Sequence, residues 1–173
     1  ISTVAGTGTI AVQAGNTLDA SAGFTPPAGH VIQVIQTVKT DTFTMNSTSY
    51  TDVTGFSATI TPTSTSNKIL IVVDTQVSGS VTYNVKLALV RGTSTYLHTK
   101  VQRIAQDGQG QYREYSLGCC YLDSPSTTDA TTYKLQMNVN GQPAYLNRPA
   151  DLAGYTPAGS ESNSTITLME IAG

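Results

Sequence analysis

The sequence is short of charge, and this shortage argues against several classes of protein. Charged residues make up 12% of the 173 residues, about half of the ~25% that is usual for a globular domain. The formal net charge is −2 and no basic stripe is present, so binding to nucleic acid or to an anionic membrane lacks its electrostatic basis. The longest apolar run, Ile69–Val73, has the length of a strand and is too short to span a membrane.

Cysteine and histidine are also scarce, with two of each. Cys119 and Cys120 are neighbours, so a disulfide between them would need a strained ring, and we expect two small buried or half-buried thiols. His30 and His98 stand apart, and the sequence has no His-x-His or Cys-x-x-Cys motif of the kind that holds zinc. We therefore expect no metal and no cofactor, and an ordinary exposed or hydrogen-bonded histidine at His98.

The chain is rich in Thr, Val, Ile and Tyr, residues that fit a half-buried pleated surface. Alternation is clearest in Tyr83–Arg91 and Tyr133–Asn140, where every second residue is apolar, as in a strand with one wet face. The run Lys68–Val77 alternates little, which predicts a central strand with both faces covered. Further strands are predicted at residues 7–13, 30–38, 51–60, 96–104, 112–122 and 164–171.

Turn signals separate these strands at regular intervals. Gly55 predicts a bulge, and Asp107-Gly108 and Asn140-Gly141 predict tight hairpins. The Pro-Pro and Gly residues before Gly29 predict a boundary between a lead-in or shaft joint at 1–29 and a domain at 30–173. We expect an all-β fold: an antiparallel β-sandwich, jelly-roll-like, of about eight to nine strands. Because the sequence begins at Ile1 without Met, we also expect a piece of a longer protein or a processed product.

Five segments of the sequence carry a resemblance: Val34–Phe43, Tyr50–Phe56, Ile60–Leu70, Tyr121–Pro125 and Thr165–Ile171. Together they resemble a structural module of bacteriophage tail fibres and other virion appendages, of the C-terminal domain type. The resemblance covers roughly residues 30–173 and carries no catalytic motif. Its lead-in, Val4–Val12, is similar to the joint between a fibre shaft and its terminal domain.

The resemblance implies a virion structural protein at the particle surface or on an appendage. It implies assembly as a homotrimer with other virion proteins, and host-surface polysaccharide as a further partner. One alternative is a capsid decoration (cement) or head-fibre protein, which stabilises a shell. Another, from a different class, is a glycan depolymerase.

The scarcity of candidate catalytic residues in the sequence favours a protein that is not an enzyme. Glycan hydrolysis uses two carboxyl groups about 5–10 Å apart, and Asp123 and Asp129 are the least poor candidates. An aspartate that caps a turn through its neighbouring backbone is the commoner interpretation for Asp123. We therefore predict no catalytic residues.

Surface recognition is the remaining function, and one long segment suits it. Loops longer than about 12–15 residues tend to be functional or disordered, and residues 141–163 combine aromatic, amide and charged side chains. Two tyrosines could stack on sugar rings while the polar side chains bond to hydroxyl groups. Alternatively, the tyrosines pin the loop to the sandwich or lie in a subunit contact. The predicted ligand-binding residues are Tyr145, Asn147, Arg148, Asp151 and Tyr155.

Overall fold

The computed structural model describes residues 14–15, 26–79, 83–104, 114–150 and 162–173. These residues form twelve strands in three antiparallel sheets, and none of them is helical. The all-β prediction is therefore confirmed. The strand predicted at 7–13 and the Asp107-Gly108 turn lie outside the described residues.

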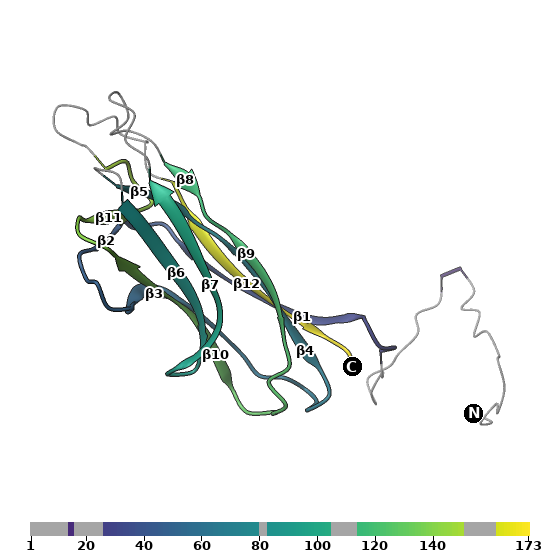
Figure 1. The fold of residues 1–173 in the computed structure, drawn as a ribbon. Coiled ribbons are helices and arrows are strands. Elements are labelled where there is room, and N and C mark those ends of the chain that lie inside the picture. The colour runs from purple at the N-terminus through teal and green to yellow at the C-terminus, as the bar shows by residue number, and fades with distance from the viewer. Residues whose placement is uncertain (1–13, 16–25, 80–82, 105–113, 151–161) are drawn as a thin grey trace.

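Two four-stranded sheets form the sandwich (Figure 1). Sheet A has the order β1-β12-β4-β9, with bounds Val31–Lys39, Ser164–Ile171, Lys68–Asp74 and Cys119–Asp123. Sheet C has the order β3-β10-β6-β7, with bounds Thr51–Ile60, Thr131–Val139, Tyr83–Arg91 and Thr95–Ile104. When the eight strands of sheets A and C are renumbered from 1 to 8 in chain order, sheet A has the order 1-8-3-6 and sheet C has the order 2-7-4-5. This is the connectivity of a jelly roll.

A third, smaller sheet continues sheet A at one end of the sandwich (Figure 1). Sheet B has the order β2-β11-β5-β8, with bounds Phe43–Met45, Ala144–Leu146, Gln76–Gly79 and Tyr115–Ser116. In the chain, β2 follows β1, β5 follows β4, and β8 precedes β9. Sheet A thus bends into sheet B, and the strand pairs β1/β2, β4/β5 and β9/β8 are each interrupted at the bend.

The core lies between sheets A and C and follows the predicted alternation. From β10, the predicted inward residues Tyr133, Leu135, Met137 and Val139 are all at most 3% exposed. On β12, Ile166 and Leu168 are fully buried, whereas Met169 and Ile171 turn outward and are half-buried. Burial of these apolar surfaces supplies most of the free energy of folding.

The run Lys68–Val77 differs from its prediction in two ways. It is central in its sheets, but it is two strands interrupted at Thr75, whose Oγ1 donates to the carbonyl of Leu117. Its outward face is also not covered within the described chain, because Val72 is 36% exposed and Leu70 half-buried. Cover of both faces within the single chain is therefore not seen among the described residues, and cover by a neighbouring chain stays a prediction.

Three glycines show how turns and close contacts shape the sheets. Gly55 has a φ of 74° at a register shift between β3 and β10, which confirms the predicted bulge. Gly141 has a φ of 113° in a turn, but β10 and β11 on either side belong to different sheets, so the predicted hairpin is wrong. At Gly118, an added Cβ would lie 2.7 Å from the carbonyl oxygen of Val73, so no other residue fits beside β4.

The two cysteines lie on opposite faces of β9 and form no disulfide. Cys119 pairs with Val73, faces inward and is half-buried, as predicted. Cys120 pairs with Val72 on the outward face and is exposed. The prediction of a buried or half-buried thiol is wrong for Cys120, because no described layer covers sheet A on that side.

Candidate functional site

Asn147 holds the bend between sheets A and B. Its side chain is fully buried, and its backbone takes the left-handed conformation with a φ of 60°. Its Nδ2 donates to the carbonyls of Lys39, at 2.9 Å, and Asp41, at 3.1 Å. Its Oδ1 accepts from Ser164 Oγ at 2.6 Å. The predicted ligand-binding role of Asn147 is thus replaced by a structural one, in which one amide joins three strand ends.

Tyr145 and Arg148 come together beside this bend. Both side chains are half-buried, and the Arg148 guanidinium carbon lies 3.9 Å from the centroid of the Tyr145 ring. Stacking of this kind leaves the edge donors of the guanidinium available for hydrogen bonds. Two predicted ligand residues thus form a pair at the sheet B end of the sandwich, while Asp151 and Tyr155 lie outside the described residues.

Asp123 closes the opposite end of the core. It is 6% exposed, and its Oδ2 accepts from both Tyr133 Oη and Arg91 Nη1, each at 2.7 Å. Burial and then the bond to this carboxylate raise the pKa of Tyr133, so the phenol stays a donor. Asp129 is instead exposed in the loop before β10. Asp123 therefore supports the core and does not cap a turn, which corrects that interpretation.

An open hollow lies next to this end, between the β6–β7 turn and the loop before β10. Its lining is mostly threonine and carries no aromatic ring; it comprises Arg91, Gly92, Thr93, Thr95, Pro125, Thr127, Ala130, Thr131 and Thr132. The Arg91 guanidinium in it is already paired with Asp123. The hollow is polar, and it holds no stacking surface for a sugar ring.

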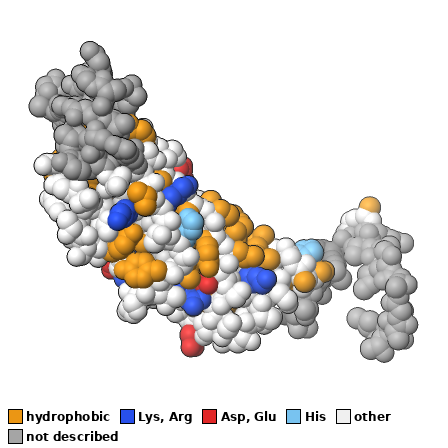
Figure 2. Space-filling model, viewed as in Figure 1, with side chains coloured by type: hydrophobic (Ala, Val, Ile, Leu, Met, Phe, Trp, Pro, Cys, Tyr) orange, Lys and Arg blue, Asp and Glu red, His pale blue; other side chains and the backbone are white. Residues whose placement is uncertain are grey.

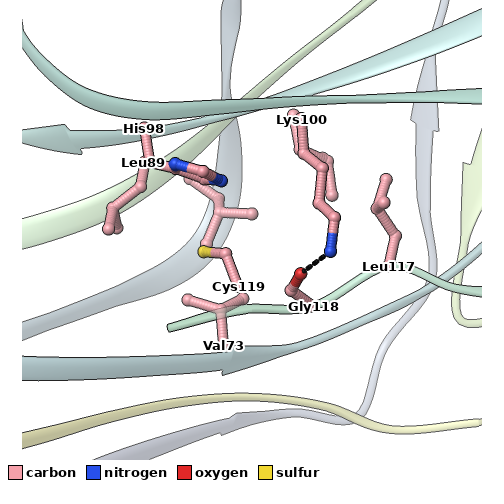
Figure 3. Close-up of a pocket in the computed structure, with 9 residues that line it drawn as sticks. Val73, Leu89, His98, Lys100, Leu117, Gly118 and Cys119 are labelled. Carbon is pink, nitrogen blue, oxygen red and sulfur yellow. Dashed lines mark hydrogen bonds between the residues drawn. The ribbon is translucent and has the colours of Figure 1, made fainter. Parts of the chain in front are cut away.

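A small cavity opens between β7 and β9, next to the inward-facing thiol of Cys119 (Figure 3). His98 and Lys100 reach into it from β7, and Lys100 Nζ donates to the carbonyl of Gly118 at 2.5 Å. Its volume of about 10 Å³ has room for about one water molecule. Burial raises the pKa of Cys119, so the thiol stays protonated and is a poor nucleophile at neutral pH. Within the described ranges, no three His, Cys, Asp or Glu side chains gather to hold a metal ion.

A polar network covers the outer face of sheet C. Tyr96 Oη donates to Gln136 Oε1 at 2.9 Å, and Gln136 Nε2 donates to Asp52 Oδ1 at 2.8 Å. Lys134 Nζ donates to Asp52 Oδ2 at 2.8 Å, and the Tyr50 ring lies 5.6 Å from that of Tyr96. This network was not predicted from the sequence. Alternation did place Lys134 and Gln136 outward, but the partners on β3 and β7 follow only from the register.

Comparisons with known proteins give no family. No family model matches the chain, and no curated protein matches it. Among solved structures, the chain is similar to one described as the structure of infectious bursal disease virus Gx strain, with 13% identity and a TM-score of 0.40. The match covers 87% of this chain and 41% of that one, so the chain spans less than half the length of that protein. No helix in the described part of the chain is long and apolar enough to cross a membrane.

Proposed function

We propose that the chain is a structural domain of a virion, of the fibre or appendage type, and not an enzyme. The observation that carries this proposal is the strand order, which is that of an eight-stranded jelly roll. Viral capsid proteins and lectins are frequent users of this architecture. One fold serves many functions, and the resemblance of residues 30–173 to virion appendage modules is a second, independent support for the proposal.

The location on the particle distinguishes this proposal from its first alternative. Antibodies against the purified chain, applied to particles from the lysate that produces it, should label an appendage in electron micrographs. Label over the shell would instead identify a decoration or head-fibre protein. Particles that carry no label at all would contradict a virion role.

A host-surface glycan is the second partner in the proposal, and Tyr145 and Arg148 are the described residues that would contact it. The phenol offers a hydroxyl and part of a ring, and the guanidinium offers donors to sugar hydroxyls or carboxylates. In a glycan array, the wild type should bind, and Tyr145→Ala and Arg148→Ala should each reduce the signal roughly tenfold, as for one lost stacking contact. Tyr96→Ala, on the outer face of sheet C, is the matched aromatic control. Equal binding by all four proteins, or an array without hits, would remove the glycan from the proposal.

The depolymerase alternative is tested separately with the wild-type protein. Incubation with capsule or surface polysaccharide from the host should release no reducing ends, because the proposal gives the chain no turnover. Asp123→Asn is a poor probe here, because it would disturb the core contacts to Tyr133 and Arg91. Turnover that is lost in Asp129→Asn would overturn the non-enzymatic proposal.

A further inference from the structure

The outward side of sheet A is apolar across all four of its strands. In the register of the sheet, Val34, Met169, Leu70 and Leu122 form one continuous row. The next row contains Gln36, Thr167, Val72 and Cys120. Figure 2 shows hydrophobic side chains gathered along the margin of the molecule on the side of β9 and β1. We call this surface the A face; its apolar members are Val31, Val34, Val38, Leu70, Val72, Leu122, Met169 and Ile171.

The A face is open to solvent in the single chain. Val34 is 54% exposed at one edge of the sheet and Leu122 is 50% exposed at the other edge. Val31 and Val38, at 53% and 48%, extend the surface along β1. Scattered apolar residues are normal on a protein surface, but a contiguous patch that spans a whole sheet marks an interaction site. The other sheet lies on the inward side and no described residue covers the A face, so this surface is suited to a partner molecule.

Two charges on β4 indicate what that molecule is. Lys68 and Asp74 are the only charged residues among the outward positions of the described sheet A strands, and both are exposed. They lie at opposite ends of the same strand, six residues apart, which corresponds to about 20 Å. The A face therefore carries one positive end, an apolar middle and one negative end, and such a surface is complementary to itself when it is turned end over end.

We propose that the A face binds the A face of a second copy of this chain about a two-fold axis. The axis lies between the two sheets, perpendicular to the strands and level with Ile71. This operation places each Lys68 opposite Asp74 of the other copy, twice per contact. Between these charges, the apolar row that contains Leu70 stacks on the row that contains Val72 in the other copy. Sheets that pack face to face do so about 10 Å apart with their strands nearly aligned, and the two-fold contact is isologous.

The same charges disfavour the other symmetric arrangements. A two-fold axis along the strands, or a threefold axis parallel to them, places copies of Lys68 at one level and copies of Asp74 at another. Like charges would then approach each other without compensation. The inference deepens the proposed function, because it names one partner of the assembly. It is compatible with the homotrimer that the resemblance implies, since the contact turns single chains into dimers and trimers into hexamers.

The solution mass tests the contact directly. Light scattering of the wild type should give an even number of chains, and Val72→Lys should halve that number. Val72 is already exposed, so an unchanged melting temperature at low concentration will show that the variant folds. Val101→Lys, at a 55% exposed valine on the outer face of sheet C, is the matched control and should keep the wild-type mass. A monomeric or trimeric wild type, or a mass that Val72→Lys leaves unchanged, would overturn the inference.

A charge exchange tests the orientation of the two copies. Lys68→Glu and Asp74→Lys should each weaken self-association roughly 3- to 10-fold, because each creates two like-charged pairs of modest strength. The double variant, with both charges exchanged, should associate within about twofold of the wild type. A double variant weaker than either single variant, or single variants without effect, would exclude this two-fold orientation. Labelling of virions by antibody does not depend on these substitutions, so the failure of this inference remains distinguishable from the failure of the proposed function.

Discussion

The two outer faces of the sandwich differ in chemistry, although both are formed by four antiparallel strands. On sheet C, the polar side chains of Tyr96, Gln136, Asp52 and Lys134 bond to one another. On sheet A, one outward row across all four strands holds only valine, methionine and leucine, and the next row holds Gln36, Thr167, Val72 and Cys120. The difference shows that polar side chains lie over much of the outer face of sheet C within one chain, whereas the A face is suited to a partner.

Cross-strand neighbours explain how sheet C covers its own outer face. Ala88 and Val90 point outward from β6 but are fully buried. In the register, Gln136 lies beside Ala88, and Lys134 and Tyr96 lie on either side of Val90. Long side chains on neighbouring strands can lie over short ones. On the A face, the neighbours of Val72 are Thr167 and Cys120, which are too short to cover it.

The largest expected effect separates the inner and outer sides of sheet A. Leu168 is fully buried between the sheets, so Leu168→Ala should lower the free energy of unfolding by about 3–4 kcal/mol through lost burial and an unfilled cavity. Val72→Ala, on the A face, should cost less than about 1 kcal/mol in the dissociated protein. Urea unfolding at low protein concentration measures both values. Similar losses for the two variants would mean that the A face is covered within the single chain.

The second effect concerns Glu170, which anchors edge strand β1 of sheet A. Glu170 is fully buried on the inward side of β12 and accepts from Gln33 Nε2, Asn67 Nδ2 and both the amide and the hydroxyl of Thr63. Burial raises the pKa of this carboxyl. The hydrogen bonds from Asn67, Gln33 and Thr63 together lower the pKa by more than burial raises it, so the pKa lies below its usual value. The resulting stability is present above the unfolded pKa of about 4.3 and is lost as the pH falls through the folded pKa.

Glu170→Gln tests this anchor. The amide NH₂ would face donors where the carboxylate accepted, so unfolding at pH 7 should become easier by about 2 kcal/mol. Between pH 6 and pH 3, roughly the range of a carboxyl titration, the urea midpoint of the wild type should fall more steeply than that of Glu170→Gln. Parallel pH profiles for the two proteins would show that Glu170 does not provide the pH dependence.

The smallest effect is expected on the outer face of sheet C. The hydrogen bond from Lys134, followed by that from Gln136, lowers the pKa of Asp52. Its side chain is 53% exposed, so solvent screening keeps the contribution well below about 1 kcal/mol. Asp52→Asn should therefore lower stability slightly at pH 7 and not at all below the folded pKa of Asp52, as measured by thermal unfolding at both pH values. A large loss would show that this network supports the fold and does not merely cover a face.

Alternation predicted the strands well where one side of a strand is apolar and the other polar. Residues on β6 and β10 face as predicted, because the side-chain period of a strand is two. The break at Thr75 was not predicted, because threonine is itself a frequent residue in strands and gives no sign of an interruption. In sheet B, β2 and β11 were missed for a related reason: each is only three residues long, too few for a pattern. By contrast, β5 and β8 overlap the predicted strands Lys68–Val77 and 112–122.

The candidate sites were less predictable, because they depend on partners that are distant in the sequence. Asn147 bonds to Lys39, 108 residues away, and Glu170 bonds to Thr63, 107 residues away. Nothing in the local sequence distinguishes such buried polar residues from exposed ones. The apolar outward side of β4 was visible as weak alternation in Lys68–Val77. The register was needed to join it to β1, β12 and β9 as one surface.

The most direct test of the difference between the two outer faces is the reactivity of Cys120, the exposed thiol on the A face. A bulky maleimide should label it rapidly in dilute protein and ever more slowly as the concentration rises and second copies cover the face. Cys120→Ser reports the background from Cys119, and Val34→Lys, which disrupts the A face far from the thiol, should be labelled rapidly at all concentrations. Equal labelling rates for the wild type and Val34→Lys at high concentration would contradict a self-associating A face.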